Sequence, residues 1–152
     1  MSSLETNKDQ DYRTSIVVNK TPAEVYEAIK NVKGWWIGTV QGDANEVGSE
    51  FNYRYKHYHN TTQKVTELTP NKRIVWRVTE ADIESPIRDE WKGTHIIFEI
   101  LPKGTETEVK FTHQGLTPKF VCYKDCSGGW DFFISKSLKN FIDNGQGIDP
   151  GF

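Results

Sequence analysis

The stretch GGWDFFISKSLKNFIDNG, residues 128–145, decides how the rest of this chain folds. Apolar side chains recur along it with the three- and four-residue spacing of one helix face. That face consists of Trp130, Phe133, Ile134, Leu138, Phe141 and Ile142, with Ser137 as its only polar member. Asp125 or Ser127 is expected to cap the start of the helix, and Asn144-Gly145 supplies a left-handed stop. A helix this apolar on one side needs a broad apolar surface to cover, and we expect the middle of the chain to provide it.

Length, charge and cysteine content bound the class of protein. A chain of 152 residues is about one domain, and 19 basic against 21 acidic residues give a net charge of −2. We therefore expect neither nucleic acid nor an anionic membrane as a partner. The polar start MSSLETNKDQDYR has no apolar run, so we expect no signal peptide, no membrane insertion and a cytoplasmic location. Cys122 and Cys126 lack zinc-site spacing, and we predict reduced thiols, no metal and no cofactor.

Upstream of the long helix, the chain reads as short helices followed by alternating strands. Thr21, Pro22 and Glu24 form a capping box that opens a short helix, and Trp35-Trp36 follow on a second short helix or a turn. Period-two alternation predicts strands at residues 12–19, 39–43, 50–59, 61–68, 73–79, 91–101 and 105–113. We expect a long loop at residues 115–127, which places both cysteines in a loop.

The order of these elements predicts an α+β fold. We expect the antiparallel strands, about seven of them, to form one curved sheet with the helices segregated at the ends of the sequence. The apolar face of this sheet should wrap around the C-terminal helix. We place a disordered N-terminal tail at residues 1–11, the domain at 12–145 and a C-terminal tail at 146–152.

Five segments carry a resemblance to a known superfamily. They are IVVNKTPAEVYEAI at 16–29, VGSEF at 47–51, KVTELTPNKRIVWRV at 64–78, TEVKFTHQG at 107–115 and GWDFFISKSLKNFI at 129–142. In order and spacing the chain resembles the START-like superfamily, also called SRPBCC or helix-grip, over roughly residues 12–144. Within it, the chain is similar to the branch homologous to the C-terminal domain of the heat-shock protein 90 ATPase activator. The resemblance implies a seven-stranded antiparallel sheet gripping the last helix, with a cavity between them.

Aromatic residues make up 12% of the chain, and five of them are tryptophans. Buried tyrosines and tryptophans keep polar groups that need partners, as ligand pockets tend to provide. We therefore expect a continuous cavity between sheet and helix. The candidate ligand-binding residues are Trp35, Trp36, Phe51, Tyr53, Tyr55, His57, Trp76, Val78, Trp91, Phe98, Phe111, His113, Trp130, Phe133 and Ser137.

Three histidines are candidates for polar roles. His57 and His59 follow Tyr53 and Tyr55 on one strand face, either at a cavity mouth or in solvent beyond the end of the core. Without a nearby carboxylate, they are a poor metal signal. His113 shares a face with inward residues, and it is the one candidate catalytic residue, as a general base. The alternative is a core histidine satisfied by a partner such as Ser137.

Three functions remain open. The first is a binding protein for a small apolar, aromatic or lipid-like molecule, as a monomer or weak dimer. The second, an enzyme, follows from the resemblance, because the superfamily contains aromatic-ring cyclases and hydratases, and would act on an aromatic or polyketide-like molecule. The third is a chaperone-associated module, which we rank last because only about eleven residues precede the domain. The sequence contains no nucleophile–base pair, phosphate loop or cofactor fingerprint, which favours binding over catalysis.

Overall fold

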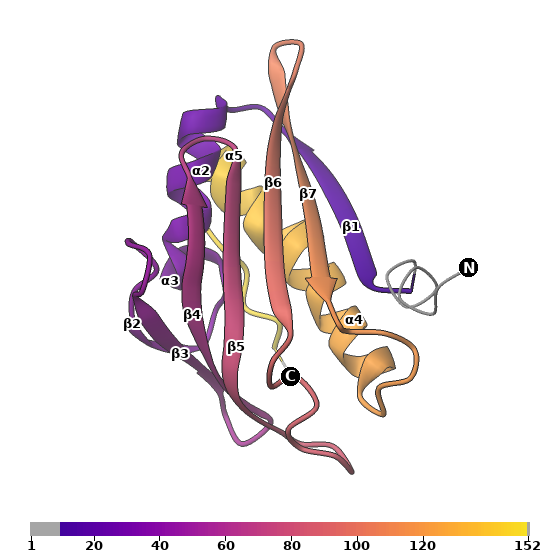
Figure 1. The fold of residues 1–152 in the computed structure, drawn as a ribbon. Coiled ribbons are helices and arrows are strands. Elements are labelled where there is room, and N and C mark those ends of the chain that lie inside the picture. Colours follow the sequence, from indigo (N-terminus) through magenta and orange to yellow (C-terminus); the bar gives the residue numbers. More distant parts are fainter. Residues whose placement is uncertain (1–9, 152) are drawn as a thin grey trace, which may run out of the picture.

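The computed structural model describes residues 10–151, so nearly all of the N-terminal tail expected at residues 1–11 lies outside the described residues. Seven strands and a set of helices make up the fold (Figure 1). The strands are β1 (Tyr12–Val18), β2 (Thr39–Gly42), β3 (Glu50–Tyr55), β4 (His59–Thr69), β5 (Arg73–Ile83), β6 (His95–Lys103) and β7 (Glu106–Gln114). The helices are α2 (Pro22–Lys30), α3 (Val32–Trp35), α4 (Tyr123–Phe132), the π-helix η1 (Phe133–Leu138) and α5 (Lys139–Asn144).

All seven strands belong to one antiparallel sheet in the order β1-β7-β6-β5-β4-β3-β2. The first strand is carried across to pair with the last, with Ile16 opposite Val109, and the remaining strands follow as hairpins. The sheet curves around the C-terminal helix, which runs across its concave face (Figure 1). This arrangement confirms the predicted α+β helix-grip fold.

The capping box predicted from the sequence opens α2. The Thr21 hydroxyl accepts from the Glu24 backbone N–H, and the Glu24 carboxylate accepts from the Thr21 backbone N–H, so two otherwise unpaired donors are satisfied. Helix α2 contacts β6 and α5, and α3 contacts η1. Both short helices therefore lie on the concave face beside the C-terminal helix, where they bring Trp35 and Trp36 into the core.

The C-terminal helix starts earlier and is less regular than the apolar pattern indicates. It begins at Tyr123, after Cys122 as N-cap, so Cys126 lies in the helix and neither Asp125 nor Ser127 caps it. The predicted loop at residues 115–127 is thus too long. In its middle, residues 133–138 form a π-helix, a wider turn that often marks functional sites. The helix ends as predicted at Gly145, with a φ of 85°.

Three strand ends differ most from the prediction. Strand β5 continues to Ile83 instead of ending at residue 79, because its last residues pair with β4, as at His59 opposite Ile83. The alternation from Glu50 stops at Tyr55, because residues 56–58 form a turn with Lys56 at a φ of 50°. His57 is therefore in the turn, and His59 opens the next strand. The segment at residues 91–93 is a turn with Gly93 at a φ of 88°, so β6 begins at His95. These local turns interrupt a pattern that otherwise has the period of a strand.

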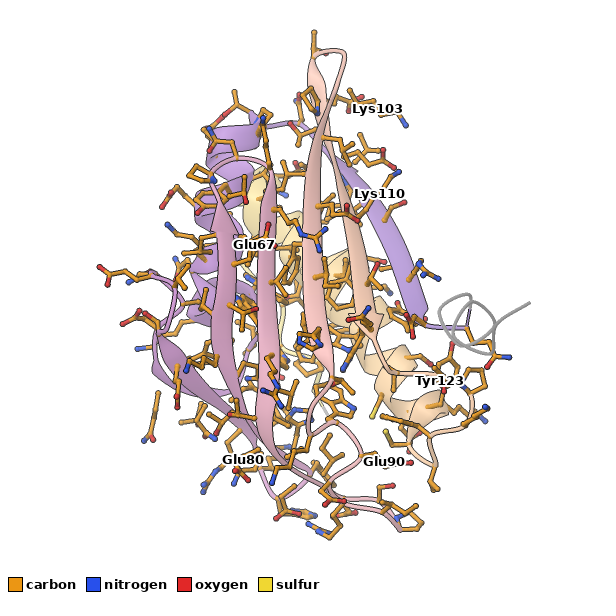
Figure 2. All side chains as sticks on the ribbon, in the orientation of Figure 1. Glu67, Glu80, Glu90, Lys103, Lys110 and Tyr123 are labelled. Carbon is orange, nitrogen blue, oxygen red and sulfur yellow. The ribbon has the colours of Figure 1, made fainter. Side chains whose placement is uncertain are left out.

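The two faces of the sheet differ in polarity. The convex face carries long polar side chains, among them Glu67 and Lys110 (Figure 2), and Arg73 forms ion pairs with Glu67 and Glu99 there. The concave face carries the core, with the fully buried side chains Ile74, Trp76, Ile96, Phe98, Val109 and Phe111. Residues 146–151 continue along this side, because the Ile148 backbone N–H donates to Ser137 Oγ at 2.9 Å. The predicted C-terminal tail is thus attached to the domain.

Candidate ligand pocket

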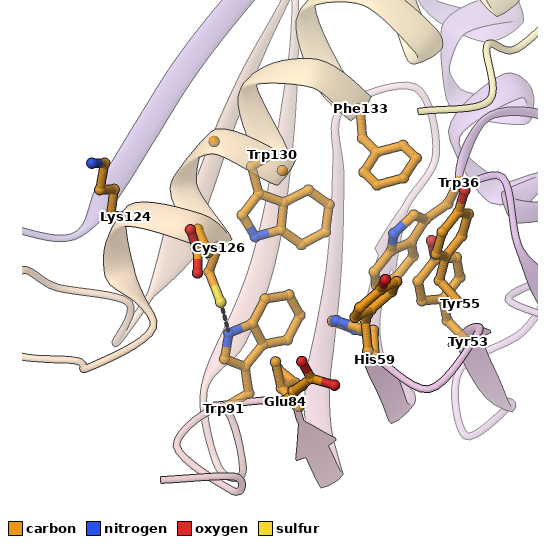
Figure 3. Close-up of a pocket in the computed structure, with 15 residues that line it drawn as sticks. Trp36, Tyr53, Tyr55, His59, Glu84, Trp91, Lys124, Cys126, Trp130 and Phe133 are labelled. Atoms are coloured by element: carbon orange, nitrogen blue, oxygen red, sulfur yellow. Dashed lines mark hydrogen bonds between the residues drawn. The ribbon is translucent and has the colours of Figure 1, made fainter. Parts of the chain in front are cut away.

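A pocket of about 550 Å³ lies between β3–β5 and the first part of the C-terminal helix (Figure 3). Its walls are mostly aromatic, and its charged residues come from the loop after β5 and from α4. The lining residues are Trp36, Tyr53, Tyr55, Tyr58, His59, Ile83, Glu84, Trp91, Lys124, Asp125, Cys126, Gly128, Gly129, Trp130 and Phe133. A volume of this size is within the usual range of small-molecule sites.

One wall is built from Trp36 and Tyr53. Trp36 follows the last residue of α3, and its ring stacks on Tyr53 with centroids 4.2 Å apart and planes 14° apart. The Tyr53 hydroxyl donates to the Ile37 carbonyl at 2.9 Å, which ties the strand to the segment after α3. Burial raises the pKa of Tyr53 far above its usual value, so the phenol stays protonated.

An adjoining part of the lining is built from Trp91 and Trp130, whose rings are stacked at 5.7 Å with planes 13° apart, and Trp130 contacts Trp36 with ring centroids 5.0 Å apart. Trp91 belongs to the turn before β6, and its Nε1–H donates to Cys126 Sγ at 3.3 Å. The Cys126 thiol in turn donates to Cys122 Sγ at 2.7 Å. This hydrogen bond and burial raise the pKa of Cys126, while the bond from Cys126 lowers that of Cys122. The two cysteines therefore help to hold one wall of the pocket.

His113 lies behind this wall and is fully buried. Trp130 Nε1–H donates to His113 Nδ1 at 2.9 Å, so the ring proton sits on Nε2, which donates to Thr94 Oγ1 at 2.8 Å. The Thr94 hydroxyl in turn donates a hydrogen bond to the Trp91 carbonyl at 2.6 Å. Burial lowers the pKa of His113 to about 3. Both ring nitrogens are engaged, which fits the core-histidine alternative; the suggested partner Ser137 instead donates to the Trp35 carbonyl.

His59 lines the pocket between the two aromatic walls. Its ring stands edge-on to Tyr53 at 5.1 Å and to Trp91 at 4.9 Å. Its Nε2 lies 3.0 Å from Thr61 Oγ1, and burial alone lowers its pKa to about 3. His59 is therefore neutral at pH 7, and the pocket interior has no formal positive charge from it.

Charged and phenolic groups stand at the outer part of the pocket. Tyr55 donates its hydroxyl to Asp149 Oδ1 at 3.1 Å, so the C-terminal segment is fixed beside the pocket. Glu84 is paired with the exposed His57 at 3.2 Å, and Lys124 and Asp125 come from α4. The charged side chains of the lining are thus one cation against two carboxylates.

The structure brings six of the fifteen proposed ligand-binding residues together around the pocket: Trp36, Tyr53, Tyr55, Trp91, Trp130 and Phe133. His57 lies in the exposed turn outside it. The other eight are buried in the core beyond the pocket, namely Trp35, Phe51, Trp76, Val78, Phe98, Phe111, His113 and Ser137. Their rings contact one another, as at Trp76–Phe98 with centroids 5.0 Å apart, so the cavity is confined to one end of the sheet.

Several lining residues were not predicted from the sequence. The sequence leaves His59 either at a cavity mouth or in solvent, and the structure places it in the lining because the chain turns at residues 56–58, which carry no clear turn signal. Gly128 and Gly129 stand at the start of the predicted helix, and only the structure shows that a Cβ on either would meet nothing within 4 Å. Glu84, Lys124 and Asp125 reach the pocket through loop and helix geometry that periodicity does not encode.

Within residues 10–151, no three side chains of histidine, cysteine, aspartate or glutamate gather closely enough to hold a metal ion. None of the described helices combines the length and apolar character needed to span a membrane.

Known proteins share this fold and part of this sequence. A solution structure of the Aha1 dimer from Colwellia psychrerythraea is similar with a TM-score of 0.73 and 28% identity, over 90% of this chain and 98% of that one. Protein MLL2253 from Mesorhizobium loti matches with a TM-score of 0.69 and 18% identity, over 86% and 96% of the two chains. DynU16, a putative protein in the dynemicin biosynthetic locus, matches with a TM-score of 0.67 and 15% identity, over 91% of this chain and 49% of that one.

No curated protein matches the chain. The family model described as activator of Hsp90 ATPase homolog 1-like protein matches residues 19–143, which is most of the chain and includes every strand from β2 to β7. Together with the Aha1 fold, this match places the chain in the START-like superfamily. The chain belongs to the activator of Hsp90 ATPase homolog 1-like family.

Proposed function

We propose that this protein binds a small, largely apolar aromatic molecule in the pocket between its sheet and its C-terminal helix. The observation that carries the proposal is the pocket itself, about 550 Å³ and lined by two adjoining aromatic pairs, Trp36–Tyr53 and Trp91–Trp130. Planar ligands gain both buried apolar area and ring contacts against such a lining.

The shape of α4 supports the same function. Gly128 and Gly129 lie in the helix wall, and a Cβ on either would stand in open space. Glycine weakens a helix interior by roughly 0.5–1 kcal/mol relative to alanine. Two successive glycines at the pocket therefore lower the stability of the helix, and they leave room for a ligand against the backbone.

Binding to planar tricyclic probes tests the proposal. Fluorene and fluorenone are titrated into the protein, and quenching of the pocket tryptophans gives the affinity and stoichiometry. We expect one probe molecule to bind per protein chain. The variant Gly129→Leu places a side chain into the open space, and it should weaken binding by about tenfold or more. Lys136→Leu on the exposed side of the helix is the matched control, and it should leave affinity unchanged. Failure of both probes to bind would overturn the proposal for this class of ligand.

The enzymatic alternative depends on a titrating group beside the ligand. His113, the candidate base, has both nitrogens engaged by Trp130 and Thr94, so neither is available to a substrate. Binding is therefore the function that the geometry supports best, and a search for product from each bound probe by mass spectrometry tests the alternative directly.

A second candidate is a chaperone-associated role, favoured by 28% identity to the Aha1 dimer over 90% of this chain. In that role the protein would stimulate the ATPase of an Hsp90 chaperone. Steady-state ATP hydrolysis by Hsp90 with and without this protein tests the idea, and sedimentation of the protein alone tests for a dimer. A rate unchanged at saturating concentrations would remove this candidate.

A further inference from the structure

Trp36 turns an unused hydrogen-bond donor toward the pocket. Three of the five tryptophans donate their Nε1–H to the protein, to the Ile29 carbonyl, Cys126 Sγ and His113 Nδ1. Trp36 Nε1 has no acceptor among residues 10–151, and it keeps some accessible surface. Trp76 Nε1 is also unpaired, but it is fully enclosed. An indole nitrogen can only donate. The free donor of Trp36 is therefore available to a molecule in the pocket.

The second donor is His59, and its tautomer follows from Thr61. The Thr61 side chain is fully buried, and its hydroxyl has one partner among the described residues, His59 Nε2. If Nε2–H were the donor, the Thr61 hydroxyl proton would be buried without an acceptor, which folded proteins avoid. Thr61 therefore donates to Nε2, and the neutral ring carries its proton on Nδ1.

Nδ1 of His59 is open to the pocket as well. It has no hydrogen-bond partner within residues 10–151, and it keeps some accessible surface. The His59 and Trp36 rings lie 6.0 Å apart between centroids, so both can reach the same end of one bound molecule. Two N–H donors thus stand close together in a pocket whose surroundings are otherwise aromatic.

We propose that the pocket selects planar aromatic ligands that carry a neutral acceptor oxygen, such as a ring carbonyl, held by His59 Nδ1–H and Trp36 Nε1–H. The proposal rests on the binding function above and names its ligand class. A neutral oxygen fits better than a carboxylate, because His59 is uncharged and the lining carries Glu84 and Asp125 against Lys124 alone. An anion there would be desolvated without a matching positive charge.

The matched probes separate this inference from the function on which it rests. Fluorene and fluorenone have nearly the same shape, and only fluorenone offers a carbonyl acceptor. Fluorenone is also the more polar compound, so apolar burial alone gives it no advantage. We expect the wild-type protein to bind fluorenone about tenfold more tightly than fluorene, as two net hydrogen bonds predict. Binding of both probes with equal affinity, or tighter binding of fluorene, overturns the acceptor inference while the binding function stands.

Variants locate the donors. His59→Phe and Trp36→Phe each remove one N–H and keep a ring, so each should reduce the ratio of fluorenone affinity to fluorene affinity measured on the same variant, even where the smaller or altered ring also changes fluorene affinity. His95→Phe, at a half-buried position of β6 outside the pocket, is the control and should keep the full preference. A preference for fluorenone that survives in both ring variants overturns the assignment of these donors. The wild-type comparison decides the central point even if a variant fails to fold, and binding of neither probe overturns the function and the inference together.

Discussion

The Trp130 indole N–H donates to Nδ1 of His113 at 2.9 Å, and this one contact fixes both the tautomer of the histidine and the position of a pocket wall. An imidazolium would carry a proton on Nδ1 and could not accept from Trp130. The contact therefore selects the neutral ring, in agreement with the pKa of about 3.

The buried His113 makes stability depend on pH. Its pKa is about 3 in the folded state against about 6.5 unfolded, so the unfolded chain binds the extra proton between these values. Stability from this group is complete above pH 6.5 and falls as the pH drops, by up to about 1.4 kcal/mol per unit. Urea melts of wild type and His113→Gln between pH 5 and 7 should show a shallower loss for the variant. Parallel curves would mean that the pKa of His113 is the same in the folded and the unfolded protein.

The same variant bears on function. Gln can accept from Trp130 and donate to Thr94, so His113→Gln should keep fluorenone affinity within about tenfold of wild type. If His113 were a general base, binding would persist while turnover fell by about 10²–10⁴-fold. Titration of the probe followed by a product assay distinguishes the two roles.

Leu138 tests the phase of the C-terminal helix. It is fully buried in η1, so Leu138→Ala should lower the free energy of unfolding by about 2–5 kcal/mol. Lys136→Ala, two residues earlier on the exposed side, should change it by no more than about 0.5 kcal/mol. Lys139 is a poorer control, because its ammonium donates to the Val17 carbonyl at 2.8 Å and pairs with Asp143. Denaturant melts of both alanine variants measure the difference, and equal losses would contradict the helical phase.

Gly129→Ala should separate stability from binding. Because its Cβ meets nothing within 4 Å, alanine should raise the free energy of unfolding by about 0.5–1 kcal/mol. The added methyl group projects into pocket space, so affinity for the probes should fall. Melting curves and fluorescence titration on one preparation check both effects, and a stabilised variant with full affinity would show that the ligand avoids this wall.

Replacement of Gln63 by an apolar residue should stabilise the protein. Its side chain is fully buried on β4, and neither amide atom has a partner among the described residues. Gln63→Met should raise the free energy of unfolding by about 1–3 kcal/mol, because an unpaired buried amide is removed. Gln114→Met at an exposed position is the control, expected within about 0.5 kcal/mol. A loss of stability in Gln63→Met would mean that the amide is hydrogen-bonded in solution.

Periodicity predicted the fold because the buried positions repeat. The face from Trp130 to Ile142, the capping box at Thr21 and the stop at Gly145 are local signals, and the structure contains each of them. The π-helix at 133–138 and the start of α4 at Tyr123 were not predictable, because packing against the sheet, rather than spacing, sets them.

The site was harder to predict than the fold, because an inward-facing aromatic residue has the same periodicity in a packed core as in a pocket wall. Trp76 and Trp130 both face inward, yet only Trp130 lines the pocket. His59 lines the pocket because the chain turns at residues 56–58, and strand alternation does not predict that turn. Whether a buried residue meets another side chain or open space depends on the curvature of the sheet, which no local pattern records.

The pairing of β1 with β7 has a consequence for synthesis in the cell. Ile16 emerges from the ribosome long before Val109, so the first strand has no partner until nearly all of the sheet has been made. The concave face stays uncovered for longer still, because the helix that covers it, ending at Asn144, is translated after all seven strands. Apolar surface is thus exposed throughout translation, and contacts between residues this distant in sequence form slowly. The nascent chain should therefore bind general chaperones during synthesis, and premature termination within the last helix should give a product that aggregates.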